Sequence, residues 1–451
     1  MDNDDVMTLP PSFDLGVSTS SFQTEGGASE RGESIWDRFL SRSRLDGDDW
    51  RVATDHLARM EEDLDLVAGS GASVYRFSVS WPRLQPDGKG APRREALDVY
   101  DRLIDEALNR GLDPWPCLYH WDLPQALQEK GGWGNRDTAY RLADYANVVG
   151  ELLGGRARRV FVHNEPNVHA VLGHLAGRHA PGSSDLPTFL AATHHLNLAL
   201  GLATARLREV EPNTEVGTIL SLQPIEAAEQ GEEHAAAAAL ADAAFNRSFL
   251  DPLLSRGYPE PLAGMLDPYV ESGDMALIAQ PLDVLGVNYY TRLRVIADPR
   301  GHAGLALADP PAGAQVTGMG WEVVEDGLMQ VLTMLRDEYG DPPVVVTECG
   351  AAYEDVPNRD GRVEDVERAR FIVGHLRTTL AARAAGCDVR GYLVWTLVDN
   401  LEWVEGFDQR FGIVRLERPS MRRTPKLSYD VLARIARTGE VPPVDAFSEL
   451  V

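Results

Sequence analysis

Several features that define whole classes of proteins are scarce or missing in this chain of 451 residues. There are only three cysteines, Cys117, Cys349 and Cys387, and their spacing fits no metal site, which excludes a disulfide-dense scaffold and a cysteine zinc centre. No apolar run approaches the ~18 residues that a membrane span needs. Residues 1–5 are acidic and lack the basic region and apolar core of a signal peptide. We therefore expect reduced thiols and a cytoplasmic location.

Positive charge is also in short supply. The chain has 43 Lys and Arg against 69 Asp and Glu, so its formal net charge is −26. Such a surface repels phosphate backbones and anionic membranes, so we expect neither nucleic acid nor membrane as a partner. It argues weakly against a phosphorylated substrate, although a local basic pocket could override the average. No cofactor and no metal is predicted, and the sequence leaves monomer or dimer open.

Apolar strands and helical stretches alternate along almost the whole chain. Strands are predicted at 13–18, 73–77, 115–120, 159–164, 216–220, 282–288, 344–347 and 389–395. Helices are predicted at 54–67, 95–110, 138–153, 186–210, 231–250, 325–338, 366–385 and 427–436. Residues 298–320, rich in Gly, Ala and Pro, are predicted to form a long loop.

This eightfold alternation predicts an α/β fold, a single (β/α)8 TIM barrel over residues 1–451, with 1–10 and 438–451 as irregular tails. A doubly wound sheet is the structural alternative. No Gly-x-Gly-x-x-Gly sequence follows a strand, and no repeat or linker divides the chain. The barrel is therefore the better interpretation.

Two of the predicted strands end in a glutamate. The apolar run 159–164 is followed by Glu165 and Pro166. The run 344–347 is followed by Glu348, with Gly350 two residues after that. A carboxylate directly after an apolar run does not enter a core alone, because burying an unpaired charge is costly. In a barrel the C-terminal ends of all strands meet at one rim. We therefore expect a two-carboxylate active site there.

The other strand ends add amides, aromatic side chains and a few charges. Gln23, Arg76, His120, Trp121, Asn288, Tyr290 and Trp395 all follow or end predicted strands. Amides and carboxylates hydrogen-bond to hydroxyl groups, and indole faces stack on the apolar face of a pyranose, so this set suits a sugar. A metal hydrolase built on His120, Asp122, His163 and Glu165 is the competing interpretation, and it explains fewer residues.

Four motifs make a family resemblance. They are Phe13-x-x-Gly16-x-Ser18-Thr19-Ser20-Ser21-x-Gln23-x-Glu25-Gly26, Asn164-Glu165-Pro166, Thr347-Glu348-Cys349-Gly350, and Trp395-Thr396-Leu397-x-Asp399-Asn400-x-Glu402-Trp403-x-x-Gly406 with the following Arg410-Phe411-Gly412-Ile413. In this order, and over nearly the whole chain, they resemble glycoside hydrolase family 1, the β-glucosidase family.

The resemblance implies a retaining, exo-acting β-glucosidase, an O-glycosyl hydrolase of carbohydrate metabolism that acts on a β-glucoside or a short β-linked oligosaccharide. Glu348 is then the nucleophile and Glu165 the acid/base, Arg76 and Tyr290 keep Glu348 ionised, and Asn288 supports Glu165. The negative charge of Glu348 is expected to hold Glu165 neutral. The implied sugar-binding residues are Gln23, His120, Trp121, Asn164, Trp321, Trp395, Glu402, Trp403 and Phe411.

Two alternatives stay open beside this interpretation. A 6-phospho-β-glycosidase typically carries Ser and Lys in the region of Glu402 and Trp403, and their absence disfavours it. A catalytically silent sugar-binding barrel would be signalled by loss of Glu165 or Glu348, and both are present.

The chain departs from the family pattern at Cys349, His163, Val160 and Asn167. Cys349, a weaker hydrogen-bond partner than the usual Asn, is expected to alter the support of Glu348.

Overall fold

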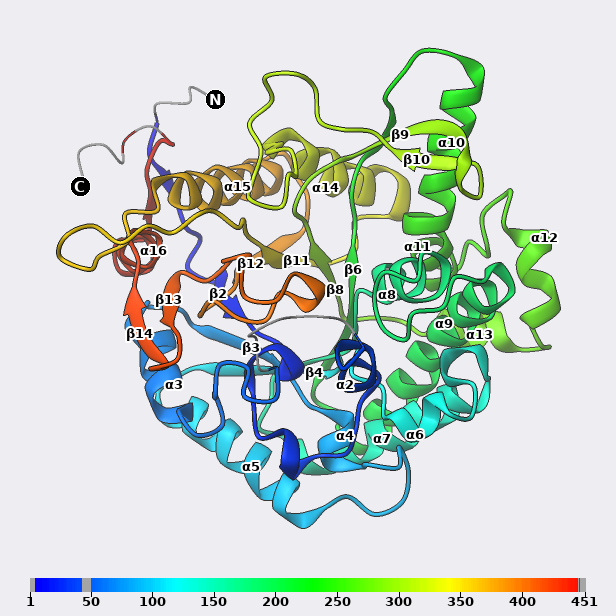
Figure 1. The fold of residues 1–451 in the computed structure, drawn as a ribbon, viewed down its shortest axis with the longest axis horizontal. Coiled ribbons are helices and arrows are strands. Elements are labelled where there is room, and N and C mark those ends of the chain that lie inside the picture. Colours follow the sequence, from blue (N-terminus) through cyan, green and yellow to red (C-terminus); the bar gives the residue numbers. More distant parts are fainter. Residues whose placement is uncertain (1–4, 43–49, 445, 447–451) are drawn as a thin grey trace.

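Eight parallel strands close into a barrel at the centre of the computed structural model, which describes residues 5–42, 50–444 and 446 (Figure 1). Around the barrel the strands follow the order β11-β12-β2-β3-β4-β5-β6-β8, and this confirms the predicted fold class. Their bounds are β2 (Asp14–Ser18), β3 (Val74–Ser78), β4 (Asp113–Tyr119), β5 (Arg159–Asn164), β6 (Glu215–Ser221), β8 (Val284–Asn288), β11 (Val344–Cys349) and β12 (Val389–Trp395).

The inside of the barrel is filled with side chains. Every barrel strand except β2 contributes to one buried cluster of branched, aromatic and sulfur-containing residues, namely Val74, Trp115, Cys117, Phe161, Ile219, Val284, Val345 and Leu393. On β2, Gly16 stands where an added Cβ would lie 2.5 Å from the Val74 carbonyl oxygen, so only glycine fits there. The barrel is thus a packed core that supports a site at its rim.

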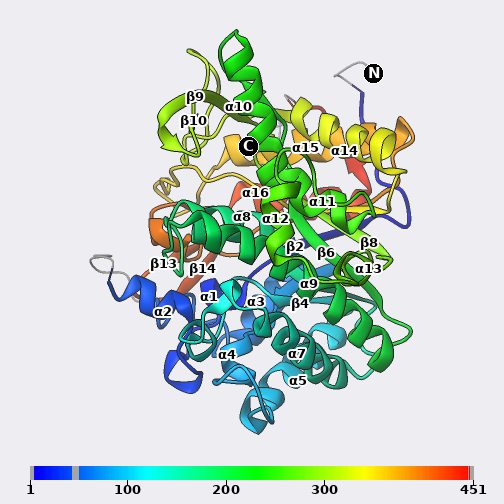
Figure 2. The same cartoon turned by 90° about the vertical axis from the view of Figure 1, so that its right-hand side faces the viewer.

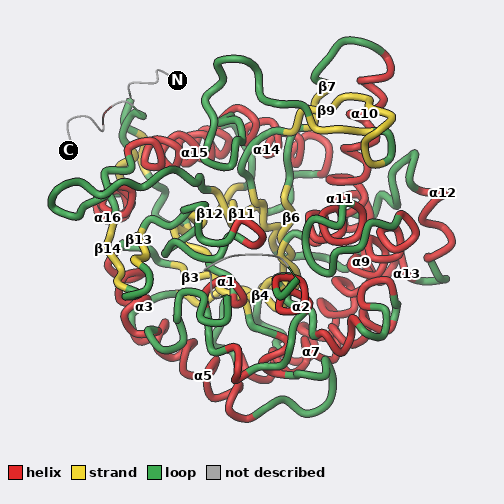
Figure 3. The backbone as a smooth tube through the Cα atoms, in the orientation of Figure 1, coloured by secondary structure: helices red, strands yellow, loops and turns green. Residues whose placement is uncertain are grey.

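A ring of helices covers the outside of the barrel (Figure 3). These helices are α3 (Met60–Gly69), α5 (Arg94–Asn109), α7 (Asp137–Leu153), α9 (Leu186–Val210), α11 (Ser248–Leu253), α13 (Asp274–Ile278), α14 (Glu325–Tyr339), α15 (Val366–Ala384) and α16 (Leu427–Thr438). The longest, α9, is capped by Asp185, whose carboxylate accepts a hydrogen bond from the Thr188 backbone N–H at 2.9 Å.

Short helices lie in the loops between these elements: α1 (Ser21–Thr24), α2 (Ile35–Leu40), α4 (Trp81–Leu84), α6 (Gln125–Gln128), α8 (Pro166–Ala170), α10 (Glu232–Asp242) and α12 (Ala263–Leu266). In the part of the chain that the structure describes, no helix is both long and apolar enough to cross a membrane.

Three sequence expectations are corrected by the structure. The helix predicted at 54–67 begins only at Met60, because the Thr54 hydroxyl donates to the Thr24 carbonyl instead of capping a helix. The predicted loop 298–320 contains the end of β9 (Leu293–His302) and all of β10 (Leu305–Leu307). With β7 (Ile225–Ala227) these form a small sheet that projects from the barrel beside α10 (Figures 1 and 2).

The two tails are not irregular throughout. In the described parts of both tails, β1 (Met7–Thr8) pairs antiparallel with β15 (Glu440–Val441). Residues 1–4, 445 and 447–451 lie outside the described residues. A further hairpin, β13 (Val414–Glu417) and β14 (Arg422–Pro425), precedes α16.

Candidate active site

The predicted site residues converge at the C-terminal ends of the barrel strands. Because side chains alternate along a strand, Arg76 lies on the same inner face as Val74, Asn288 on that of Val284, and Trp395 on that of Leu393. Strand period alone therefore directs these three side chains to the rim.

Two irregularities in strand register change the direction of side chains at the ends of β5 and β11, the strands that lead to the two glutamates. On β5 the pairing with β6 shifts between Phe161 and Asn164, and on β11 the pairing with β8 shifts between Val346 and Glu348. Strict alternation from Val345 would point Glu348 at the helices. The extra residue turns it inward, as bulges beside active sites commonly do.

Glu348 is held by a buried cation and a phenol. The Arg76 guanidinium forms an ion pair with one carboxyl oxygen of Glu348, and the Tyr290 hydroxyl donates to Oε2 at 2.7 Å. Burial raises the pKa of the Glu348 carboxyl, whereas Arg76, Tyr290 and Asn288 each lower it. These three donors favour the ionised form, which is the form that can act as a nucleophile.

Glu165 has a weaker set of donors. Its Oε1 accepts one hydrogen bond, from Asn288 Nδ2 at 2.9 Å. Burial, and after it the negative charge of Glu348, raises the pKa of Glu165 to about 8, although Asn288, Arg76 and Ser221 oppose this. Burial is therefore a larger cause than the charge of Glu348, on which the sequence argument relied. This raised pKa favours the protonated form of Glu165 at neutral pH, which is the form that can donate a proton.

Asn164 links the two glutamates and fixes the state of His120. Its Oδ1 accepts from Arg76 Nη2 at 2.7 Å and from Asn288 Nδ2 at 3.1 Å, so its Nδ2 must face His120 Nε2, 3.1 Å away. His120 Nε2 is then the acceptor and Nδ1 carries the proton. Burial holds the pKa of His120 well below its usual value. Among the described residues this Nδ1–H has no partner, so it is a donor available to a hydroxyl group.

Glu402 supplies a second buried polar group without a partner in the described part of the chain. Its Oε2 is buried, and no described residue donates to it. Burial, followed by the charges of Glu348 and Glu165, raises the pKa of Glu402 to about 8. Gln23 donates to Asn400 Oδ1 at 3.2 Å and to the Leu401 carbonyl at 2.8 Å, so it holds the chain just before Glu402.

Aromatic rings surround these polar groups. The His120 ring stacks near both Trp395 and Trp403, with centroids 6.0 and 5.9 Å away, and Trp121 lies 4.7 Å from Trp403. A second group joins Tyr290, Trp321 and Phe411, whose ring centroids lie 5.6 to 6.2 Å apart. All fourteen predicted site residues therefore lie in one connected region at the rim, with Tyr290, Trp321 and Glu402 only partly buried.

The departures from the family pattern lie mostly behind the site. The Cys349 thiol faces Tyr392 on the helix side of β11, and burial raises its pKa to about 12. Cys349 is therefore a packing residue, and the expectation that the change from Asn alters the support of Glu348 stays a prediction. His163 packs edge-on against Tyr119 and Trp133, and Val160 is also part of the helix-side core. Asn167 bridges to β6, donating to the Ser221 carbonyl at 2.7 Å.

The sequence analysis missed Ser221. It ends β6 opposite Asn288 and hydrogen-bonds to Glu165, which lowers the pKa of that carboxyl. The predicted strand 216–220 stops one residue too early to include it. The strand-end rule that found Glu165 would have found Ser221 with the correct boundary.

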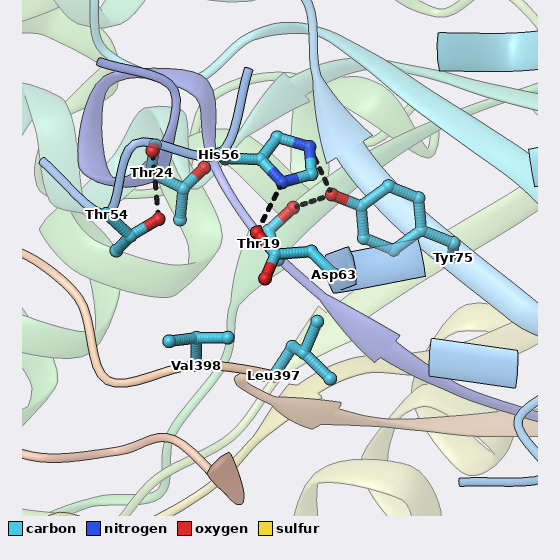
Figure 4. Close-up of a pocket in the computed structure, with 8 residues that line it drawn as sticks. All are labelled: Thr19, Thr24, Thr54, His56, Asp63, Tyr75, Leu397 and Val398. Carbon is cyan, nitrogen blue, oxygen red and sulfur yellow. Dashed lines mark hydrogen bonds and ion pairs between the residues drawn. The ribbon is translucent and has the colours of Figure 1, made fainter. Parts of the chain in front are cut away.

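A small cavity near β2 and β3 is separate from this site (Figure 4). Its polar lining is a chain in which Thr19 donates to the Tyr75 hydroxyl, Tyr75 contacts His56 Nε2, and His56 Nδ1 pairs with Asp63 at 2.8 Å. The cavity volume is about 10 Å³, enough for one water molecule and far too small for a sugar. Within the described ranges, no three His, Cys, Asp or Glu side chains are grouped so as to hold a metal ion.

Comparison with known proteins agrees with this geometry. The sequence profile of glycosyl hydrolase family 1 matches residues 6–441. The chain is 38% identical over 433 residues to beta-glucosidase A of Acetivibrio thermocellus, covering 93% of this chain and 96% of that protein. It is 41% identical over 434 residues to thermostable beta-glucosidase B of Thermobispora bispora, covering 94% and 89%. The beta-glucosidase from Thermotoga maritima in complex with glucoimidazole superimposes with a TM-score of 0.90 at 37% identity, covering 96% and 99%.

Proposed function

Because the chain belongs to glycosyl hydrolase family 1, we propose that it is a retaining, exo-acting β-glucosidase in which Glu348 is the nucleophile and Glu165 the acid/base. The observation that carries the assignment of roles is the difference between the two carboxyl groups. Glu348 has a cation and a phenol as donors, whereas Glu165 has a pKa of about 8. One is suited to attack, and the other to donate a proton.

In the first step an ionised Glu348 oxygen attacks the anomeric carbon from the face opposite the leaving group. The bond to the glycosidic oxygen breaks while Glu165 gives that oxygen its proton. The product is a glucosyl ester of Glu348 and a free alcohol. Esterification removes the negative charge that raises the pKa of Glu165, so the now ionised Glu165 is a competent base.

In the second step Glu165 takes a proton from water, and the oxygen attacks the anomeric carbon from the face that the alcohol left. The ester bond to Glu348 breaks, and the carboxylate returns to Arg76 and Tyr290. Two inversions give β-glucose, which is net retention. Asn288, which donates to Glu165 and contacts Asn164, supports the positions of both carboxyl groups.

Sugar binding uses the remaining polar and aromatic groups. We assign the unpartnered His120 Nδ1–H and Glu402 Oε2 to hydroxyl groups of the glucosyl ring. Gln23 and Asn164 lie beside them, and Trp395, Trp403 and Trp121 offer faces for stacking. Trp321 is partly buried and packs against the buried Phe411, and we propose that Trp321 meets the aglycone.

Two finer points are also proposals. We propose that the whole chain is one catalytic domain and that it works in the cytoplasm. Cys117, Cys349 and Cys387 are unpaired and buried, as is usual for a reducing compartment.

Proton NMR during hydrolysis of nitrophenyl β-glucoside tests the function. We expect turnover, with β-glucose as the first anomer to appear and α-glucose following only by mutarotation. Nitrophenyl α-glucoside is the control substrate and should not be hydrolysed. If α-glucose appeared first, the retaining mechanism would be wrong, and an inactive wild type on β-glucosides would contradict the substrate assignment.

A further inference from the structure

Two irregular segments flank the site without a strand or long helix to hold them. Residues 350–365, the nucleophile-side segment, follow Glu348 on β11. Residues 396–413, the sugar-side segment, follow β12 and carry Glu402, Trp403 and Phe411. Because no described residue donates to Glu402 Oε2, the position of this carboxyl depends on the backbone that carries it.

A buried ionic cluster lies behind both segments. It consists of two cations and three carboxylates, namely Arg368, Lys426, Asp355, Asp365 and Asp399. All five side chains are at most 6% exposed, so neither water nor salt screens them effectively. Nothing in the reaction described above uses these residues.

Lys426 joins the two segments directly. Its ammonium group forms an ion pair with Asp355 of the nucleophile-side segment and donates to Asp399 Oδ1 at 2.7 Å and to the Gly412 carbonyl at 2.6 Å, both in the sugar-side segment. These three contacts use all three N–H donors of the ammonium. The Lys426 backbone N–H also donates to the Ile413 carbonyl at 3.0 Å.

The other members extend the connection. Asp399 Oδ1 accepts from the Gly412 backbone N–H at 2.9 Å, so it folds the sugar-side segment back on itself between Asn400 and Phe411. Arg368 donates to the Ala351 carbonyl at 3.1 Å and to the Arg410 carbonyl at 2.6 Å, one in each segment. The stretch that carries Glu402 is thus fastened at both of its ends.

We propose that Lys426 is a positioning residue for catalysis. By connecting the sugar-side segment to the nucleophile-side segment, it fixes the position of the Glu402 carboxyl relative to Glu348. This inference rests on the proposed function, because it assigns a role in the same reaction. Lys426 touches neither substrate nor reacting atoms and acts only through Asp355, Asp399 and the backbone of Gly412.

A double-mutant cycle between Lys426→Met and Glu402→Gln tests the proposal on nitrophenyl β-glucoside. We expect Lys426→Met to lower kcat/KM by about 100-fold, the scale of a misplaced binding group. We also expect Glu402→Gln to cost at most about twofold more in that background, because its contribution is already lost. Full additivity of the two losses would overturn the proposal.

Arg423→Met is the matched control. Arg423 is a buried cation on β14, three residues from Lys426, and it pairs with Asp63 and the Thr54 carbonyl away from the site. This variant should lower the melting temperature while kcat/KM and the cost of Glu402→Gln stay within about twofold of wild type. If Lys426→Met behaves like this control, the cluster is only structural.

If Lys426→Met is not recovered folded, Asp399→Asn replaces it in the same cycle, because it keeps the volume and removes one charge. Non-additivity with Glu402→Gln is again expected, and additivity would again overturn the proposal. Wild-type turnover is measured alongside every variant. An inactive wild type contradicts the proposed function, whereas an active wild type with additive variants contradicts only the role of Lys426.

Discussion

At the scale of single residues, the catalytic assignment depends on unequal environments for two chemically identical side chains. Glu348 meets a guanidinium and a phenol, whereas Glu165 meets an amide and shares a desolvated space with a second carboxylate. The environment therefore separates nucleophile from acid. Because each glutamate ends an apolar strand, the sequence predicted a two-carboxylate site, and the family resemblance implied which glutamate takes which role.

The pH dependence of kcat/KM reports the protonation of Glu165. The acid must carry its proton to protonate the leaving group, so activity is present below its pKa and is lost as the pH rises through about 8. We expect the alkaline limb of the wild-type profile near this value, measured on nitrophenyl β-glucoside.

Glu402 also has a pKa of about 8, and a variant separates the two groups. Glu165→Ala, assayed on dinitrophenyl β-glucoside, whose leaving group needs no protonation, should lack the alkaline limb. An unchanged limb in this variant would assign it to Glu402 or another group and remove the evidence that Glu165 is the acid.

At the scale of elements, the strands that carry the proposed catalytic residues depart from regular strand geometry at their ends. The register shifts of β5 and β11 turn Asn164 and Glu348 toward the site. Three site residues that are not glycine adopt left-handed backbone conformations, Trp121 with φ 72°, Glu165 with φ 46° and Trp403 with φ 48°. For such residues this conformation is strained, so neighbouring contacts must hold it.

The backbone at Glu165 gives a prediction that is independent of activity. Glu165→Gly should be more stable than Glu165→Ala by about 1 kcal/mol, because glycine adopts the left-handed conformation without the clash of a Cβ. Urea unfolding of the two inactive variants measures this difference. At Glu348, which has no positive φ, the same pair should show the opposite order. An alanine variant as stable as the glycine variant at position 165 would argue against strain there.

The sequence predicts the barrel strands but not the irregularities within them. Apolar runs that alternate with helical stretches predicted all eight barrel strands. They could not reveal the register shifts, since both faces of such a strand are buried and the pattern carries no alternation. The sequence predicted a loop over 298–320, which holds the end of β9 and all of β10, because the Gly, Ala and Pro content of this stretch hides its strands.

The side chains at the rim could be predicted from the sequence, but the ionic contacts behind them could not. Motifs, strand ends and the family resemblance together identified the fourteen side chains at the rim. None of them indicated that Lys426 and Arg368 meet Asp355 and Asp399 behind it. These contacts join residues up to 71 positions apart, which only the folded chain brings together.

At the scale of the whole molecule, the closed barrel brings the ends of β5 and β11, which are far apart in sequence, to one rim. In the proposed mechanism Glu348 and Glu165 act from opposite faces of one sugar ring. Substituting either glutamate therefore tests this geometry, because it changes the face from which the sugar is attacked.

The most direct test supplies azide to Glu348→Ala and to Glu165→Ala with dinitrophenyl β-glucoside and identifies the glucosyl azide by NMR. In Glu348→Ala, azide fills the space of the lost nucleophile and displaces the leaving group directly, which predicts α-glucosyl azide. In Glu165→Ala, Glu348 still forms the ester and azide attacks from the other face, which predicts β-glucosyl azide. Opposite anomers from the two variants would support the account, whereas the same anomer from both would contradict it.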